Sequence, residues 1–89
     1  MIEKKVTITN KLGLHARAAA RFVRLANRFG STVKIEKDGN VIDGKSILGI
    51  LTLAAIQGTE VILRVSGRDE KAAVRALVRL VENKFDEEE

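Results

Sequence analysis

The 89-residue sequence contains no cysteine, no tryptophan and no tyrosine. Without cysteine it can form neither disulfide bonds nor thiolate metal sites, which fits a reducing compartment. Its three aromatic residues are all phenylalanine. That number is too small for the row of stacking side chains with which single-stranded nucleic acids are usually bound. The composition therefore favours neither a disulfide scaffold nor a base-stacking platform.

Long apolar runs are also missing. The first residues, MIEKKVTIT, hold no apolar segment of signal-peptide length, and no stretch approaches the ~20 apolar residues that span a bilayer. Apolar residues make up 45% and charged residues 31% of the chain, a balance typical of globular proteins. We therefore expect one cytoplasmic, monomeric domain over residues 1–89, without membrane contact, metal ion or organic cofactor.

The formal net charge of +4 is unevenly distributed along the chain. Residues 86–89 are all acidic, and without these four charges the remaining body would carry a formal charge of +8. We expect the acidic tail to be a frayed, solvated end with no specific role. A basic body suits two classes of partner, namely nucleic acids, or acidic protein surfaces and phosphate groups.

Hydrophobic periodicity predicts the element order β-α-β-β-α-β-α. An Asp38-Gly39 hairpin turn is expected between the second and third strands. The strands are expected at 2–9, 32–37, from 41 and at 60–66, and the helices at 16–29, at 47–53 and from 69 through an apolar stripe that ends at 85. Hairpin-joined strands with one apolar face predict an α+β two-layer open-faced sandwich, a four-stranded antiparallel sheet with three helices on one face.

The first predicted helix has two distinct faces when wound at about 100° per residue. One face is apolar and is expected to face the core: Ala19, Phe22, Val23, Ala26 and Phe29. The opposite face is a row of guanidinium groups: Arg17, Arg21, Arg24 and Arg28. By itself, this row is more typical of a merely solvated helix face than of a binding surface.

The only histidine, His15, follows a glycine-containing loop and stands at the start of this helix. The positive end of the helix dipole disfavours an imidazolium ring, so the ring is expected to be neutral and nucleophilic. A phosphoryl group on the ring would meet unpaired helix amides, each such interaction being worth roughly 0.3–1 kcal/mol, and Arg17 could bind it bidentately. A solvated or capping histidine is the structural alternative.

Two segments carry a family resemblance. GLHARAAA at 13–20 resembles the active-site segment of HPr, the histidine-containing phosphocarrier family of the bacterial phosphoenolpyruvate-dependent phosphotransferase system. GKSILGILTLAAIQGTEV at 44–61 is similar to the second signature of this family, around its regulatory serine. The spacing of the two segments also matches, so the resemblance covers essentially the whole chain.

The resemblance implies that His15 is phosphorylated on Nδ1 by phospho-enzyme I and passes the group to a IIA protein or domain, with assistance from Arg17. Such a protein is a carrier rather than an enzyme. One position departs from the family pattern, because Ala18 stands where the family commonly has proline. Proline presets the first helical turn, whereas alanine has the best helix propensity. We expect the site to persist with a slightly looser helix start.

Ser46 is predicted to be the N-cap of the second helix. The resemblance adds regulatory phosphorylation by an HPr kinase/phosphorylase, and a phosphoserine at a helix N-terminus would add about −1.5 to −2 charge without unfolding the helix. Residues 39–46 also satisfy the P-loop pattern GxxxxGK[ST]. The first half of that pattern is predicted to be a hairpin turn and a strand, which excludes a nucleotide-binding loop.

The second helix is apolar nearly all round, which is more than one sheet face can bury. An exposed remainder beside the His15 loop would form a hydrophobic docking patch with an arginine rim. In the HPr family the corresponding segment contacts enzyme I and IIA proteins, while core packing is the structural alternative. The residues expected to dock partners are Ala16, Ala20, Arg21, Arg24, Ile47, Leu48 and Leu51.

Two other functions remain open at this point. A nucleic-acid-binding module could use the row of arginines against phosphates, but it would leave the His15 loop and the apolar second helix unexplained. A purely regulatory relative could act through Ser46 alone, but the presence of His15 argues against a loss of phosphoryl transfer.

Overall fold

The computed structural model describes residues 1–87 of the chain. The observed order of elements, β-α-β-β-α-β-α, agrees with the prediction. The elements are β1 (Ile2–Thr7), α1 (Ala16–Ala26), β2 (Thr32–Lys37), β3 (Asn40–Asp43), α2 (Ile47–Thr52), β4 (Glu60–Ser66), α3 (Glu70–Glu82) and the short 3-10 helix η1 (Lys84–Asp86).

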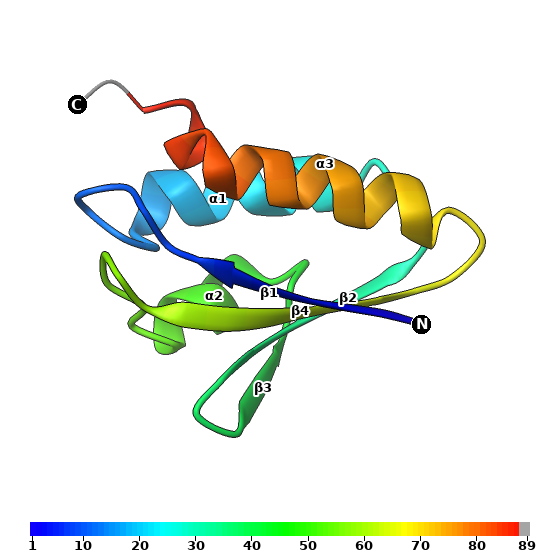
Figure 1. Ribbon diagram of the computed structural model, residues 1–89, viewed down its shortest axis with the longest axis horizontal. Coiled ribbons are helices and arrows are strands. Elements are labelled where there is room, and N and C mark those ends of the chain that lie inside the picture. The colour runs from blue at the N-terminus through cyan, green and yellow to red at the C-terminus, as the bar shows by residue number, and fades with distance from the viewer. Residues whose placement is uncertain (88–89) are drawn as a thin grey trace.

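The four strands form one antiparallel sheet in the order β1-β4-β2-β3. β4 lies in the middle, with Val61 opposite Val6 of β1 and Leu63 opposite Ile35 of β2. Figure 1 shows α1 and α3 running side by side over the sheet, and α1 also contacts α2. The predicted α+β open-faced sandwich is therefore confirmed.

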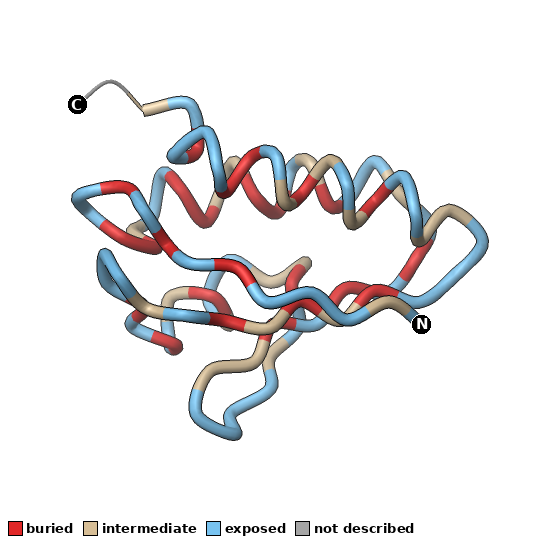
Figure 2. The backbone as a smooth tube through the Cα atoms, viewed as in Figure 1, coloured by how far each residue is buried: buried red, intermediate tan, exposed pale blue. Residues whose placement is uncertain are grey.

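The core lies between the sheet and the helices. The predicted inner face of α1 is correct for Ala19, Phe22, Val23 and Ala26, which are buried, whereas Phe29 lies beyond the end of the helix and is only partly buried against the core. Figure 2 shows buried and exposed stretches alternating along α1 and α3, as expected for helices with one face on a sheet. The Asp38-Gly39 turn is also confirmed, since both residues have positive φ and join the paired strands β2 and β3.

Several element boundaries differ from the prediction. β1 ends at Thr7, because Ile8 pairs with the 58–59 turn instead of the sheet. α1 ends at Ala26, and the next residues continue as tighter turns in which Arg28 N–H bonds Leu25 O. In both cases the apolar pattern continues past the end of the regular hydrogen bonding.

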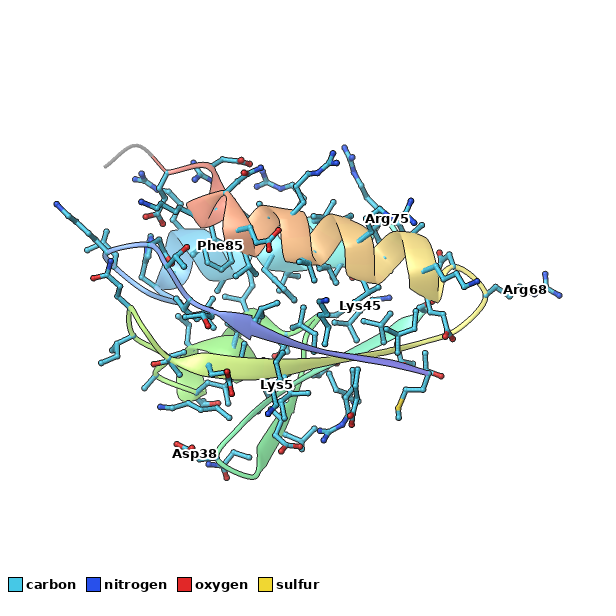
Figure 3. The ribbon with its side chains drawn as sticks, viewed as in Figure 1. Lys5, Asp38, Lys45, Arg68, Arg75 and Phe85 are labelled. Carbon is cyan, nitrogen blue, oxygen red and sulfur yellow. The ribbon has the colours of Figure 1, made fainter. Side chains whose placement is uncertain are left out.

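The end of α3 differs most. The helix ends at Glu82, and Phe85, predicted to complete its apolar stripe, lies in η1 with a φ of +56°. Lys84 and Asp86 also have positive φ, so the chain leaves the helical path after Glu82. Phe85 is nevertheless fully buried, because this turn places its ring in the core beside α1 (Figure 3). We call residues 83–87 the C-terminal turn.

None of the helices within residues 1–87 has the length and apolarity that crossing a bilayer requires.

Candidate functional site

His15 is the N-cap residue of α1, with extended backbone angles (φ −81°, ψ 178°). Its N–H donates to Gly13 O (2.9 Å), and its carbonyl accepts from Ala19 N–H (2.9 Å). The side chain makes no capping hydrogen bond, so it leaves the amides of the first helical turn to other acceptors. The ring is 28% exposed and is therefore reachable from solvent.

The loop before His15 requires glycine at position 13. Gly13 has a φ of +66°, and a Cβ on it would lie 2.4 Å from Ala55 O and 2.9 Å from Ile56 Cα. Leu14 N–H donates to the same Ala55 carbonyl at 2.9 Å. The close approach of the two loops thus fixes the point at which α1 begins.

A buried asparagine holds the other side of this loop. Asn10 is inaccessible to solvent, and its Nδ2 donates to Gly13 O at 2.8 Å. Its backbone carbonyl accepts from Gly13 N–H at 3.2 Å. Gly13, whose carbonyl accepts from the N–H of His15, is therefore held by Asn10 at both its own N–H and its carbonyl.

Arg17 and His15 line one open surface cleft. The other residues lining the cleft are Leu12, Ala16, Arg21, Asp86 and Glu87. Arg17 is exposed, and within residues 1–87 its guanidinium makes no hydrogen bond or ion pair. The cleft thus combines one imidazole ring, one available guanidinium and a helix N-terminus, a set suited to a phosphate group.

The remaining arginines of α1 have different surroundings. Arg21 is half-buried and donates from Nη1 to Phe85 O at 2.5 Å, which ties α1 to the C-terminal turn. Arg24 is exposed and lines a second groove beside Leu80.

On α3, the exposed Arg75 points away from the body of the molecule in Figure 3, as does Arg68 in the loop before it.

The acidic tail contributes a contact that the sequence analysis missed. Glu87 accepts a hydrogen bond from His15 Nε2, and Asn10 Nδ2 lies 3.4 Å from each of its carboxylate oxygens. The expectation of a solvated tail is therefore wrong for Glu87, while residues 88 and 89 lie outside the described residues. No local pattern could have found a contact that spans 72 positions.

The predicted N-cap at Ser46 is confirmed. Its backbone is extended (φ −116°, ψ 116°), and its Oγ accepts from Gly49 N–H at 3.0 Å. Val41 and Ile42, which the P-loop pattern would place in a phosphate-binding loop, lie in β3. The structure thus agrees with the exclusion of a P-loop.

The apolar second helix is only partly buried. Ile50 is fully buried, Leu51 is half-buried, and Ile47 and Leu48 are 41% and 76% exposed. On the neighbouring α1, Ala16 is exposed and Ala20 is half-buried. The exposed apolar remainder expected from the sequence is therefore present.

Two further exposed apolar residues were not predicted. Leu12, 69% exposed, lines the His15 cleft, and Ile56, 70% exposed, has its Cα against Gly13. Both lie in loops, where periodicity carries no signal. The apolar surface around His15 is thus wider than α2 alone.

Comparison with known proteins assigns this arrangement to a family. The model of the family described as "PTS HPr component phosphorylation site" matches residues 2–83. This chain belongs to the HPr family. It is 46% identical to phosphocarrier protein HPr of Xylella fastidiosa over 99% of both chains. It is 47% identical to HPr of Cupriavidus necator over the full length of both.

Solved HPr structures share the fold. HPr-C-His from Thermoanaerobacter tengcongensis superposes with a TM-score of 0.95 at 48% identity, with both chains fully covered. The Bacillus subtilis catabolite repression protein Crh, described as a swapped dimer, gives a TM-score of 0.77 at 46% identity over 94% of this chain and 97% of its own. The resemblance of the two sequence signatures is therefore confirmed, and the chain is a phosphocarrier-family protein of the phosphotransferase system.

Proposed function

We propose that phospho-enzyme I phosphorylates His15 and that a IIA protein or domain then takes the phosphoryl group. The observation that carries this proposal is the position of His15. In this HPr-family chain, His15 is the N-cap residue of α1, its ring makes no capping hydrogen bond, and the ring shares an open cleft with the exposed guanidinium of Arg17. The protein would act as a carrier between two partners and not as an autonomous enzyme.

In the proposed transfer, a ring nitrogen of His15, Nδ1 by family resemblance, attacks the phosphorus. The nitrogen–phosphorus bond forms as the bond from phosphorus to the donor breaks, and its electron pair leaves with the donor. The amides of the first turn of α1 and the Arg17 guanidinium would then face the bound dianion. Each contribution is modest, which suits a group that must be passed on.

The surface around the cleft supports a docking role. Exposed apolar side chains of α2 stand beside α1, whose basic side chains would meet acidic rims on the partners. We propose that partners contact Ala16, Ala20, Arg21, Arg24, Ile47, Leu48 and Leu51, together with Leu12 and Ile56.

We further propose that Ser46 is a regulatory phosphorylation site for an HPr kinase/phosphorylase. Its cap geometry supports this proposal, because a phosphate on Oγ would lie at the N-terminus of α2 and would not need to unfold it. The added negative charge would stand beside the apolar docking residue Ile47 and repel partners with acidic rims.

The expectations of a cytoplasmic location and a monomeric state stay predictions. One of the similar solved structures is an HPr dimer from Thermoanaerobacter tengcongensis, so the oligomeric state needs its own measurement. We do not propose nucleic-acid binding, because it would leave the His15 cleft and the exposed part of α2 without a role.

The test is intact-mass analysis after incubation with phosphoenolpyruvate and enzyme I. We expect one acid-labile phosphoryl group on the wild-type protein and none on His15→Ala. The absence of an adduct with a competent cognate enzyme I, or an adduct that persists in His15→Ala, would contradict the proposal.

A further inference from the structure

A carboxylate from the far end of the chain lies against the ring of His15. Glu87 is the hydrogen-bond partner of His15 Nε2, and its side chain is only 9% exposed. An ionised carboxylate can only accept, so Nε2 carries the hydrogen in this contact. In the neutral ring, the lone pair therefore lies on Nδ1.

The position of this carboxylate is built by three separate segments. The C-terminal turn is anchored by the fully buried ring of Phe85, whose carbonyl accepts from Arg21 Nη1 of α1. Asn10, from the loop before α1, holds Gly13 O with the same Nδ2 that lies 3.4 Å from both carboxylate oxygens of Glu87. The contact is thus part of a packed arrangement and not a chance meeting of two mobile side chains.

We propose that Glu87 is a positioning residue for phosphoryl transfer through His15, an inference that rests on the proposed function. By holding the hydrogen on Nε2, it leaves Nδ1 as the nucleophile. When the Nδ1–phosphorus bond forms and the bond to the donor breaks, the ring keeps its Nε2 hydrogen and becomes a cation. The carboxylate then stabilises that cation, as an aspartate does beside the histidine of a serine-protease triad.

The charges around the cleft make this role compatible with an incoming anion. Arg17 and Arg21 line the same cleft as Glu87, so the phosphoryl group meets positive charge as well as the carboxylate. Onward transfer reverses the same steps. As a nucleophilic atom of the IIA protein bonds to phosphorus and the nitrogen–phosphorus bond breaks, the electron pair of the broken bond returns to Nδ1 and the neutral Nε2–H ring is regenerated.

The test uses Glu87→Gln, which removes the carboxylate charge beside the His15 ring and leaves the buried core in place. Because His15 is the only histidine, its two ring nitrogens can be assigned without ambiguity by ¹⁵N NMR. In alkaline buffer, the wild type should show a protonated, pyrrole-type Nε2 and a pyridine-type Nδ1. In the variant, the two shifts should move toward each other as the tautomers mix.

The kinetic arm measures phosphorylation by enzyme I over a range of carrier concentrations. We expect Glu87→Gln to lower kcat about tenfold with KM within about twofold, since positioning acts on the reacting ring and not on docking. Glu82→Gln, the same charge change on an exposed residue at the end of α3, should match the wild type in both arms. Unchanged ring shifts or an unchanged kcat in Glu87→Gln would overturn the proposal, whereas failure of the wild type to accept phosphate would instead contradict the proposed function.

Discussion

His15 obtains its position from neighbours that have no reactive groups of their own. Gly13 brings the loop within contact of the 54–59 loop, and Asn10 holds the carbonyl that receives the N–H of His15. The sequence predicted the glycine loop and the helix start, because both are local patterns. It could not predict Asn10 or Glu87, because their contacts depend on where distant segments meet.

The backbone at position 13 gives a direct test of how single residues position His15. Gly13→Ala should lower the free energy of unfolding by about 1–3 kcal/mol, because its Cβ would overlap Ala55 O at a positive φ. It should also slow the phosphorylation of His15 by displacing the start of α1.

The matched control is Gly30→Ala, where a Cβ would meet nothing within 4 Å. Its stability should stay within about 0.5 kcal/mol of the wild type in urea unfolding. Equal stabilities for the two variants would show that the close approach at Gly13 does not hold the loop.

Among the elements, α2 combines a structural side and an exposed side within six residues. Its start was predictable because Ser46 is a typical N-cap residue, and its excess of apolar residues correctly indicated an exposed remainder. The ends of α1 and α3 were not predictable to the residue. Phe85 shows why, since an apolar residue at helical spacing can reach the core from a left-handed turn as well as from a helix.

The two roles of Ser46 can be separated by substitution. Ser46→Ala should lower the free energy of unfolding by about 1 kcal/mol, because the Gly49 N–H loses its acceptor. Ser46→Asp should keep the cap and the stability but slow phosphorylation by enzyme I through its charge. Ser46→Asn is the neutral, cap-retaining control, and an Asp variant as fast as the Asn variant would count against regulation at this position.

The two sides of α2 give a second pair of variants. Leu48→Ala should change stability by no more than about 0.5 kcal/mol, since the side chain is 76% exposed, and should raise the KM of enzyme I for this protein. Ile50→Ala should instead lower the free energy of unfolding by about 2–5 kcal/mol, because it empties a fully buried site. An unchanged KM for Leu48→Ala would show that Leu48 is not part of the docking surface for enzyme I.

At the scale of the whole molecule, Asp69 joins the two long helices at the end opposite to His15. Its carboxylate accepts from the N–H groups of Gly30 and Ser31 (2.9 and 3.0 Å) and from the Ser31 hydroxyl. These hydrogen bonds, that of the Ser31 hydroxyl above all, lower the pKa of Asp69 below its usual value. The link between the turn after α1 and the start of α3 therefore depends on an ionised carboxylate.

The sign of the resulting pH dependence follows from linkage. Because the folded-state pKa is lowered, the stabilisation is fully present above the unfolded pKa of about 3.9 and is lost as the pH falls through the lower folded-state value. Asp69→Asn should have a lower free energy of unfolding than the wild type at neutral pH. On acidification, the free energy of unfolding of the variant should fall by less than that of the wild type. Urea midpoints between neutral and acidic pH measure this difference. Asp38→Asn, at the tip of the β2–β3 hairpin, is the control and should show the same change of urea midpoint with pH as the wild type. If the urea midpoint of Asp69→Asn changed with pH as much as that of the wild type, Asp69 would be excluded as the source of the acid sensitivity.

Onward transfer from His15 tests the carrier role most directly. The wild-type protein is phosphorylated with enzyme I and phosphoenolpyruvate, separated from both, and mixed with a cognate IIA protein while the intact masses of the two proteins are followed. We expect one phosphoryl group to leave this chain as one appears on the IIA protein, with no release as free phosphate on the same timescale. A phosphorylated chain that keeps its phosphate in the presence of the cognate IIA protein, or loses it only to water, would contradict the carrier function.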